Sequence, residues 1–560
     1  MARTTPGLDF LAQNLFIPGL FLFFFLVTAR HWLDLHFATW ILVSAAVAVV
    51  SLHIIGRTVL REYVQAVEAA RMGARPAPVG SQSPISRILL GHLGYPAGTF
   101  WKLVEAYGPV LFGSNMVITT SPDHVKIILR TDSHNYAKDE SLHEAMDLVL
   151  GTGVFSLSVD MWKFHRTITR PFFDRNRVTH LEMFSHNAQS VAAQIISTMK
   201  ASQAVDFQSL IRYSTLNIAT SLLFGTCVSS LPNAPGAKPN SAFPLLPVTE
   251  FCEALLQLQD IVSERQRLGW VWPLYELLGD KAKKPLNIIG RNFDPIIQRA
   301  IGRKMMKGVG VIYHGSDGCG VGEGEGETLL DHLVELTSDA NLVKSAILNT
   351  LIAGRAGTAT TLTHLVYFLA RHPTVMSRLS AEIAAMDSAQ TPTDTDMADL
   401  RYLRAVINET LRLAPQVQYV SRESVEATTW PSPDLHEKRI YIPPRTKILF
   451  DVSALHSSNE LWGPDADHFD PDRFLDRRFT TYLAPNPHIF LPFGAGPRTC
   501  LGKDFPYDEI SVAVIELLRR FSVISLLPRS SEWDARRGLD RASSMNIPQG
   551  LWVKMEETVQ

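Results

Sequence analysis

Apolar residues recur at helical spacing along most of the chain after residue 82. Stretches in which they return every three or four residues, as in an amphipathic helix, cover 175–200, 205–227, 247–268, 285–307, 327–372, 400–413 and 503–521. Strand-like pieces are few and short, namely Val110–Phe112, Met116–Thr119, Arg439–Ile442 and Lys447–Val452. The pattern predicts a mainly α domain with a small β-sheet region over residues 82–560.

The first 56 residues have a different pattern, with two long apolar runs. Phe37–Ile55 contains no Asp, Glu, Lys or Arg, and as a helix it would be about 28 Å long, close to the thickness of a bilayer core. Phe10–Ala29 is also uncharged, but polar residues, a proline and a glycine interrupt it. A cleaved signal peptide lacks support because no cleavage site follows the first run. We therefore expect a membrane anchor of one or two transmembrane helices over residues 1–56.

Basic residues follow this anchor and predict its orientation. Residues 57–81 form a linker that contains four arginines against two glutamates and ends in a Pro/Gly-containing stretch. Because cytoplasmic flanks carry the excess of Lys and Arg, we expect the catalytic domain, residues 82–560, to face the cytosol from the endoplasmic reticulum membrane.

Composition narrows the function classes. Hydrophobic residues make up 46% of the chain and charged residues 19%, and the net charge is −2. A chain without a basic excess is not typical of nucleic-acid binding, so no nucleic-acid partner is expected. Only four cysteines are present, which excludes a disulfide scaffold. One of them, Cys500, lies among glycines.

The segment Phe493-Gly-Ala-Gly-Pro-Arg-Thr-Cys-Leu-Gly502 has the features of a thiolate loop. A cysteine that binds haem iron must project from a tight turn, and glycines such as Gly496 permit that turn and a close approach. Arg498 is placed to form a forked ion pair with a haem propionate. The helix expected after Cys500 would direct its positive end toward the sulfur, which favours the thiolate.

This decapeptide resembles the F-x-x-G-x-R-x-C-x-G signature of cytochrome P450 enzymes at every fixed position. The resemblance covers roughly residues 82–550 and implies a P450-like fold. It also implies haem b, iron protoporphyrin IX, as cofactor, with Cys500 as its metal ligand and Phe493, Gly496 and Arg498 in contact with it. The order of the motifs is most similar to fungal, membrane-bound members close to the alkane- and fatty-acid-hydroxylating group.

Two further segments carry the resemblance. Glu409-Thr-Leu-Arg412 resembles the family's E-x-x-R motif, and Phe469-Asp-Pro-Asp-Arg473-Phe resembles its second arginine motif. The resemblance implies that Glu409, Arg412 and Arg473 form a buried structural charge triad.

Candidate propionate partners come from the same resemblance. Trp162-Lys-Phe-His-Arg166 resembles W-x-x-x-R, and its Trp162 and Arg166 would share one helix face. With Arg498, these make three candidates; Arg422 is a fourth, and His456 is a further candidate for the same role.

The long helix expected over residues 341–372 departs from the family. Where the family has A/G-G-x-D/E-T-T/S, this chain reads Ala353-Gly-Arg-Ala-Gly-Thr-Ala-Thr-Thr361. In the register favoured by the spacing to His372-Pro373, Ala356 replaces the acid and Gly357 replaces the threonine. A register three residues later recovers two threonines but still lacks the acid.

The retained part of this motif, Ala353-Gly354, keeps a smooth groove for O₂. The usual proton relay lacks its acid, however, so we expect protons to pass through Thr358, one residue after Gly357, or through water held by a polar group of the substrate. Together Ala353, Gly354, Gly357 and Thr358 are the candidate catalytic positions.

The resemblance implies a membrane-anchored monooxygenase that oxidises an apolar small molecule, such as a terpenoid, a fatty acid or a related secondary-metabolite precursor. The sequence has no dinucleotide-binding motif of its own, so electrons would come from an NADPH-cytochrome reductase flavoprotein, docked by basic residues near Arg498 and Lys503. Because the acid and threonine are absent, a non-hydroxylating haem-thiolate reaction, such as a rearrangement, dehydration or peroxide-dependent oxidation, is the alternative.

Overall fold

The computed structural model describes residues 59–77, 110–112, 116–138, 146–225, 248–307, 328–386, 391–531 and 547–558, with gaps at 152, 156–158, 176, 435 and 548, together with the isolated residues Pro6 and Thr28. The membrane anchor expected over residues 1–56 lies outside these residues, as do both ends of the linker. No helix within the described part is long and apolar enough to cross a membrane.

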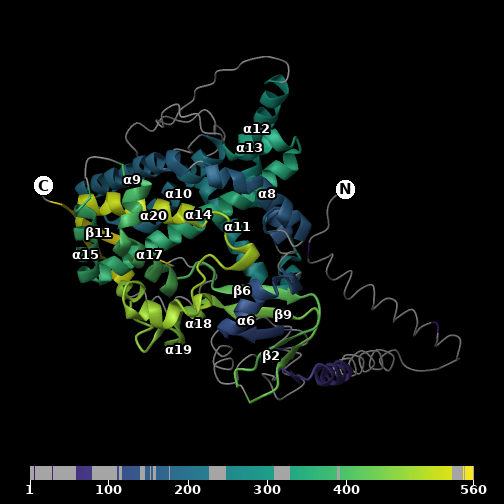
Figure 1. Ribbon diagram of the computed structural model, residues 1–560. Helices are drawn as coiled ribbons and strands as arrows, with labels where there is room; N and C mark the ends of the chain where they lie inside the picture. Colours follow the sequence, from purple (N-terminus) through teal and green to yellow (C-terminus); the bar gives the residue numbers. More distant parts are fainter. Residues whose placement is uncertain are drawn as a thin grey trace, which may run out of the picture.

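Helices make up most of the described chain (Figure 1). Their bounds are α6 (Pro122–Lys126), α8 (Val159–Arg175), α9 (Arg177–Lys200), α10 (Phe207–Phe224), α11 (Val248–Leu268), α12 (Lys283–Lys307), α13 (Leu329–Leu336), α14 (Ala340–Arg371), α15 (Pro373–Ala384), α16 (Asp394–Asp399), α17 (Arg401–Leu413), α18 (Val452–Ser457), α19 (Asn459–Trp462), α20 (Asp504–Arg520) and α21 (Pro528–Ser531). Shorter turns include η2 (Ile127–Thr131), η5 (Pro471–Phe474) and η8 (Gly496–Arg498). A further helix covers 59–71.

The strands form three small sheets, of which the largest lies below the helical body in Figure 1. Its order is β2 (Val110–Phe112), β3 (Met116–Thr119), β9 (Lys447–Asp451), β6 (Tyr419–Ser424) and β4 (Tyr136–Ala137). The second sheet has β1 (Arg75–Pro76), β8 (Ile440–Ile442) and β7 (Thr428–Trp430), and the third has β10 (Phe521–Leu526), β11 (Trp552–Glu557) and β5 (Val205–Asp206). The expected mainly α fold with a small sheet region is confirmed.

α14 runs through the centre of the helical body and contacts α10, α12, α13, α17 and α20. The Asp339 side chain begins it by accepting hydrogen bonds from the backbone N–H groups of Asn341 and Leu342. The sequence pattern predicts one stretch over 327–372, but the structure divides it, because α13 ends at an extended Thr337 before Asp339 starts the next helix.

Two separate apolar clusters hold the two halves of α14. The first half packs with α10 to α13 through residues such as Val343 and Ile347, and the second half packs with α17 and α20 through residues such as Leu365 and Leu369. The middle of the helix, residues 353–358, belongs to neither cluster. The two apolar clusters thus fix both ends of α14, and its central residues lie outside them.

A buried charge network ties α17 to η5. Glu409, Arg412 and Arg473 are each at most 2% exposed. Arg412 donates from Nε to Glu409 Oε2 at 2.7 Å and from Nη2 to Oε1 at 2.8 Å, and Arg473 Nε is 3.4 Å from Glu409 Oε1. The three residues expected to form a triad are therefore in contact, and the remaining guanidinium groups donate to backbone carbonyls, including Ala466 O at 2.6 Å from Arg412 Nη1.

Arg412→Ala should leave the buried Glu409 carboxylate with only the Asp470 N–H at 3.0 Å and the long contact to Arg473 at 3.4 Å, and losing the bidentate partner costs on the order of 3–5 kcal/mol of stability. We expect little soluble protein and a lower unfolding midpoint in urea. The matched control is Arg378→Ala, which removes an arginine from an exposed pair with Asp472, 2.7 Å apart, and should cost less than about 1 kcal/mol. Equal midpoints for the two variants would contradict a structural role for the triad.

Candidate functional site

The loop that carries Cys500 is shaped by its glycines. Gly494 and Gly496 have φ angles of 68° and 71°, which L residues with side chains rarely adopt. A Cβ on Gly496 would lie 1.7 Å from the carbonyl oxygen of Leu129 in η2, so no larger residue fits there. The Cys500 N–H closes the loop by donating to Phe493 O at 2.9 Å.

Cys500 itself is exposed, although α8 packs beside its loop. Arg166 of α8 donates from Nη1 to Thr499 O at 2.9 Å, and a Cβ on Gly502 would contact the Phe173 ring at 3.4 Å. Surrounding protein raises the pKa of the thiol, while the Gly502 N–H and the Arg166 charge lower it. A thiol in this setting becomes a stable thiolate once it binds a metal ion.

The centre of α14 has an accessible face made of small residues. Ala353 is exposed and Gly354, Ala356 and Gly357 are half-buried, whereas Arg355 and Thr358 are buried. This accessible surface lies between the two parts of α14 that the apolar clusters bury. A flat group could approach the helix closely there, since no side chain larger than a methyl group projects from these four positions.

The segment between α17 and β6 connects this face of α14 to the cysteine loop. A Cβ added to Gly357 would lie 3.8 Å from Gln416 Cγ. Val417 and Tyr419, which follow, are exposed at 54% and 41%. Further along β6, the Arg498 charge lowers the pKa of Arg422, so the strand reaches the neighbourhood of the cysteine loop.

Basic side chains from four elements converge beside this loop. The Arg498 guanidinium lies 4.5 Å from the ring of Trp162, and the Arg166 guanidinium lies 5.9 Å from the same ring. Burial and the Arg498 charge lower the pKa of Arg422 to about 10. Burial, Arg422 and Arg498 lower the pKa of Lys138 to about 7. The structure thus brings together four of the predicted propionate partners and adds Lys138.

This cluster fits an anionic cofactor. Arg498 Nη1 is buried without a hydrogen-bond partner among the described residues, and the positive charges of Arg422 and Arg498 are close enough to depress the pKa of Lys138. The negative charge of Asp147 raises the pKa of Lys138, but its effect is smaller than that of either arginine. Uncompensated buried cations are costly, and two carboxylates, as in the haem expected from the sequence, would neutralise them.

His456 has a different environment from the one expected. It is fully buried, with its Nδ1 3.1 Å from Arg412 O and its Nε2 accepting from the Leu491 N–H at 2.9 Å. Both ring nitrogens are therefore used by the backbone, and burial lowers the pKa of the imidazole to about 3. A neutral, fully bonded ring cannot serve as a propionate partner, so the structure contradicts that assignment and places His456 beside the charge triad.

Thr358, the expected proton-relay residue, faces the core. It is 1% exposed, its hydroxyl donates to Gly354 O at 3.2 Å, and it hydrogen-bonds with Glu509 of α20. Burial raises the pKa of Glu509 to about 8. The hydroxyl therefore joins α14 to α20 in the core.

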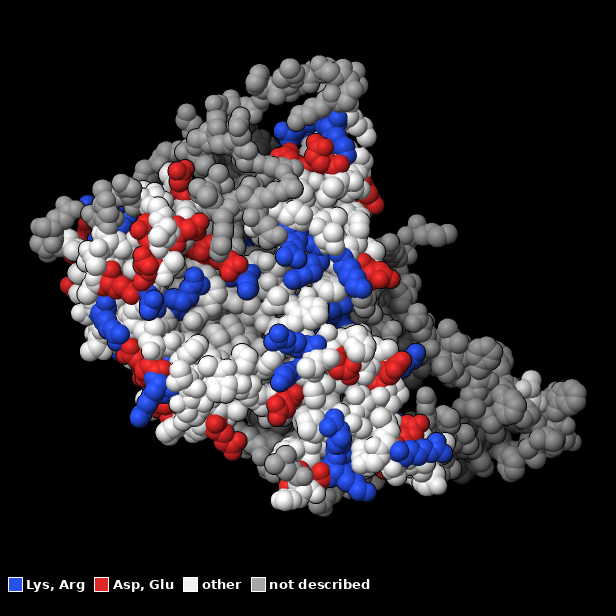
Figure 2. Space-filling model, in the orientation of Figure 1, with Lys and Arg blue, Asp and Glu red and all other residues white. Residues whose placement is uncertain are grey.

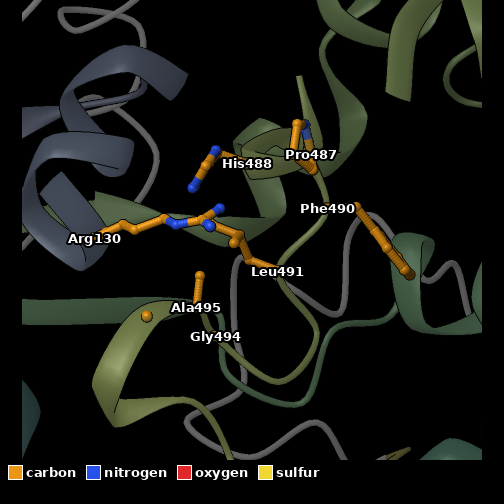
Figure 3. Close-up of a pocket in the computed structure, with 8 residues that line it drawn as sticks. Arg130, Pro487, His488, Phe490, Leu491, Gly494 and Ala495 are labelled. Carbon is orange, nitrogen blue, oxygen red and sulfur yellow. The ribbon is translucent and has the colours of Figure 1, made fainter. Parts of the chain in front are cut away.

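A separate cavity of about 350 Å³ lies on the cysteine loop (Figure 3). Arg130 of η2 reaches across it toward His488 and Leu491, and Gly494 and Ala495 form part of its wall. Neither Cys500 nor any residue of α14 is among its lining residues.

Sequence reasoning missed three polar residues around the site. Lys138 follows a two-residue strand, and Gln416 lies in an irregular segment, so neither has a motif or periodicity that marks it. Glu509 falls on an amphipathic helix, where a glutamate is ordinarily solvated, and only its 4% exposure distinguishes it.

Comparison with known proteins agrees with this geometry. The family model described as Cytochrome P450 matches residues 89–548. Cytochrome P450 52E1 of Candida apicola is 29% identical, with 74% of this chain and 77% of the relative covered. Cytochrome P450 52A9 of Candida maltosa is 30% identical, with 80% and 82% covered. A cytochrome P450 of Arthroderma benhamiae is 31% identical, with 73% and 78% covered.

The match extends over most of the chain and includes the cysteine loop, the charge triad and the long central helix. All three relatives are fungal proteins. This chain belongs to the cytochrome P450 family and is a monooxygenase whose cofactor is a haem with a cysteine thiolate ligand.

Proposed function

We propose that this protein is a membrane-anchored monooxygenase that oxidises an apolar small molecule, with Cys500 as the thiolate ligand of its haem. The convergence of basic side chains beside an accessible cysteine carries this proposal. The bound haem supplies the oxygen chemistry, in which O₂, two electrons and two protons give one oxygen atom in the product and one molecule of water.

The residues of this chain have three tasks in binding the cofactor. Arg166, Arg422, Arg498 and Lys138 pair with the propionates, and Trp162 packs beside two of these cations. The small residues of α14 admit the macrocycle and O₂. The Gly502 N–H bond to sulfur stabilises negative charge on Cys500.

The substrate class follows from the exposed residues beside α14. Ala353 of α14 and Val417 and Tyr419 of the segment after α17 are exposed, and none of them carries a charge. An apolar substrate is favoured because its transfer from water to such a surface contributes binding free energy. A fatty acid, a terpenoid or a related metabolite precursor has this character.

The electron donor proposed is an NADPH-dependent flavoprotein reductase that docks beside the cysteine loop. Lys163 and Arg170 of α8 and Lys503 before α20 are exposed. Figure 2 shows Lys and Arg side chains gathered on the middle of one face, where Figure 1 places α8 and the loop entering α20. A basic surface of this kind steers an acidic partner.

Membrane attachment is supported by the helix over 59–71, which directly follows the proposed anchor. Val59, Leu60, Tyr63 and Val64 lie on one side of this helix and are exposed. The other side faces the catalytic domain, where Glu68 accepts a hydrogen bond from Tyr441 and Ala69 packs against it. An exposed apolar face at this position suits the lipid interface, with the domain on the cytosolic side of the endoplasmic reticulum.

Haem retention should depend on pH through Lys138. Its pKa is lowered from 10.5 to about 7, so in haem-free protein it is largely neutral above pH 7. Propionates raise this pKa, so haem binding takes up a proton and the affinity falls as pH rises, by at most about tenfold per pH unit. Lys138→Met should bind haem more weakly at pH 7 and lose this slope between pH 8 and 10, measured by transfer to a haem acceptor. The control Lys126→Met, exposed on α6, should keep it, and identical slopes for all three proteins would contradict the assignment.

In microsomes that contain the protein and its reductase, NADPH should be consumed with formation of an oxygenated product from an apolar substrate. Untargeted product comparison with microsomes that lack the protein identifies that product. Cys500→Ser should abolish both the product and the strongly red-shifted band of the reduced, carbon-monoxide-bound protein. Turnover without NADPH would instead indicate a rearrangement, dehydration or peroxide-dependent reaction.

Protease added to intact microsomes should digest the catalytic domain and leave a membrane-bound N-terminal fragment. A protein confined to the lumen serves as the control for vesicle integrity and should survive. Survival of the catalytic domain until detergent is added would show the opposite orientation.

A further inference from the structure

The relay of this enzyme cannot use the side chains that α14 ordinarily provides. Position 356 is alanine and position 357 is glycine, and neither can hold a proton or a water molecule by a side-chain hydrogen bond. Thr358 is turned into the core, where its hydroxyl is bonded to Gly354 and Glu509. Between residues 353 and 357, the accessible face of α14 therefore has no polar side chain. Arg355 is buried, and its Nε donates to Arg212 O of α10 at 3.5 Å.

Among the described residues, one side chain lies beside Gly357. Apart from its two chain neighbours and the backbone of the helix itself, the only described atom within 4 Å of a Cβ built on Gly357 is Gln416 Cγ, at 3.8 Å. That separation is an ordinary van der Waals contact, so the glutamine occupies the edge of the volume that a threonine would fill. Its amide lies two bonds or fewer beyond Cγ, within reach of the same volume.

The backbone on both sides of Gln416 is fixed. The Ala414 N–H donates to Thr410 O at 2.8 Å at the end of α17, and Gln418 O accepts from the Val452 N–H at 2.7 Å. The Gln416 amide is less constrained, because its one hydrogen bond to the described residues runs from Nε2 to Ala414 O at 3.4 Å. Its oxygen and its second N–H are therefore available to another molecule.

We propose that Gln416 is a positioning residue of the oxygenation reaction, whose amide binds a water molecule in the volume left by Gly357. The proposal rests on the proposed function and deepens it. An amide does not ionise, so the protons come from solvent through this water. An amide can still hold a water molecule in place because it both donates and accepts hydrogen bonds. A side chain from the segment after α17 thus replaces one that the family places on the long helix.

The experiment compares Gln416→Met with wild type in the full-length protein with its reductase. Methionine has a similar volume but no amide. We expect product per NADPH to fall about tenfold, the effect of one lost hydrogen bond in the transition state, with the missing electrons recovered as peroxide. The matched control is Gln418→Met, which removes an amide from the same segment and should keep the wild-type ratio.

Two further measurements distinguish a positioning role of Gln416 from a structural one. Gly357→Thr in the Gln416→Met background supplies a hydroxyl to the same volume and should restore most of the coupling. Independently of turnover, the infrared C–O stretch of the reduced, carbon-monoxide-bound protein reports nearby hydrogen-bond donors, and it should shift in Gln416→Met but not in Gln418→Met.

Each outcome decides the proposal. Unchanged coupling and an unchanged C–O stretch in Gln416→Met would overturn it, as would a loss of coupling that Gly357→Thr fails to restore. If Gln416→Met loses haem, Gln416→Glu is used, which keeps the size and hydrogen bonding and adds an ionisable group. A pH dependence of coupling that appears only in Gln416→Glu supports the proposal, and an unaltered pH profile contradicts it. Absence of product from the wild type with every substrate, despite a shifted C–O stretch, would count against the proposed function and not against this inference.

Discussion

The ion pairs of Glu409 with Arg412 and Arg473 hold together the parts of the chain from which the site is built. Arg412 lies in the last turn of α17, and the segment that carries Gln416 and then Arg422 begins directly after this helix. The carbonyl of Arg412 binds His456, whose other nitrogen binds the Leu491 N–H shortly before the cysteine loop. The buried Glu409 carboxylate thereby fixes the position of the segment after α17. Through Arg412 and His456 it also fixes the chain that leads into the cysteine loop. This network explains why His456 is buried and neutral rather than available to a ligand.

The second constraint is electrostatic. Burial lowers the pKa values of Lys138, Arg422 and Arg498; the Arg498 charge lowers those of Arg422 and Lys138 further, and the Arg422 charge adds to the effect on Lys138. Such an arrangement lowers the stability of the empty protein and is relieved when two carboxylates enter, so the cofactor's binding free energy is partly the removal of this repulsion. The same reasoning applies to Cys500, whose pKa is raised by its surroundings and which a metal ion would deprotonate. The charged forms of the basic cluster and of Cys500 therefore cost free energy in the empty protein, and binding of the haem stabilises them.

Much of this organisation was predictable from the sequence, for identifiable reasons. α9, α10, α11 and α17 bury an apolar stripe, so periodicity located their ends to within three residues. The cysteine loop and the triad were predictable because fixed spacings of Gly, Arg and Cys serve one geometry. β6 was not, because its mixed residues Tyr419–Ser424 show no strand pattern, and it is a strand because β9 and β4 pair with its two edges. Lys138 and Glu509 escaped notice because their importance arises only from burial among charges or hydroxyls far away in sequence.

The two halves of α14 show how this long helix can keep its place in the fold without polar groups at its centre. The helix is fixed by separate apolar clusters at its ends, so replacing an acid and a threonine in its middle removes no packing that the fold requires. What it removes is a pair of hydrogen-bonding groups from a face that must remain close to a flat cofactor. A neighbouring segment can replace them only if its backbone is as well fixed as the helix. The chain from Ala414 to Gln418 meets that requirement, because the end of α17 anchors one side and the pairing near β9 and α18 anchors the other. A missing side chain on the helix is thus compensated most readily where the triad has already made the adjacent backbone rigid.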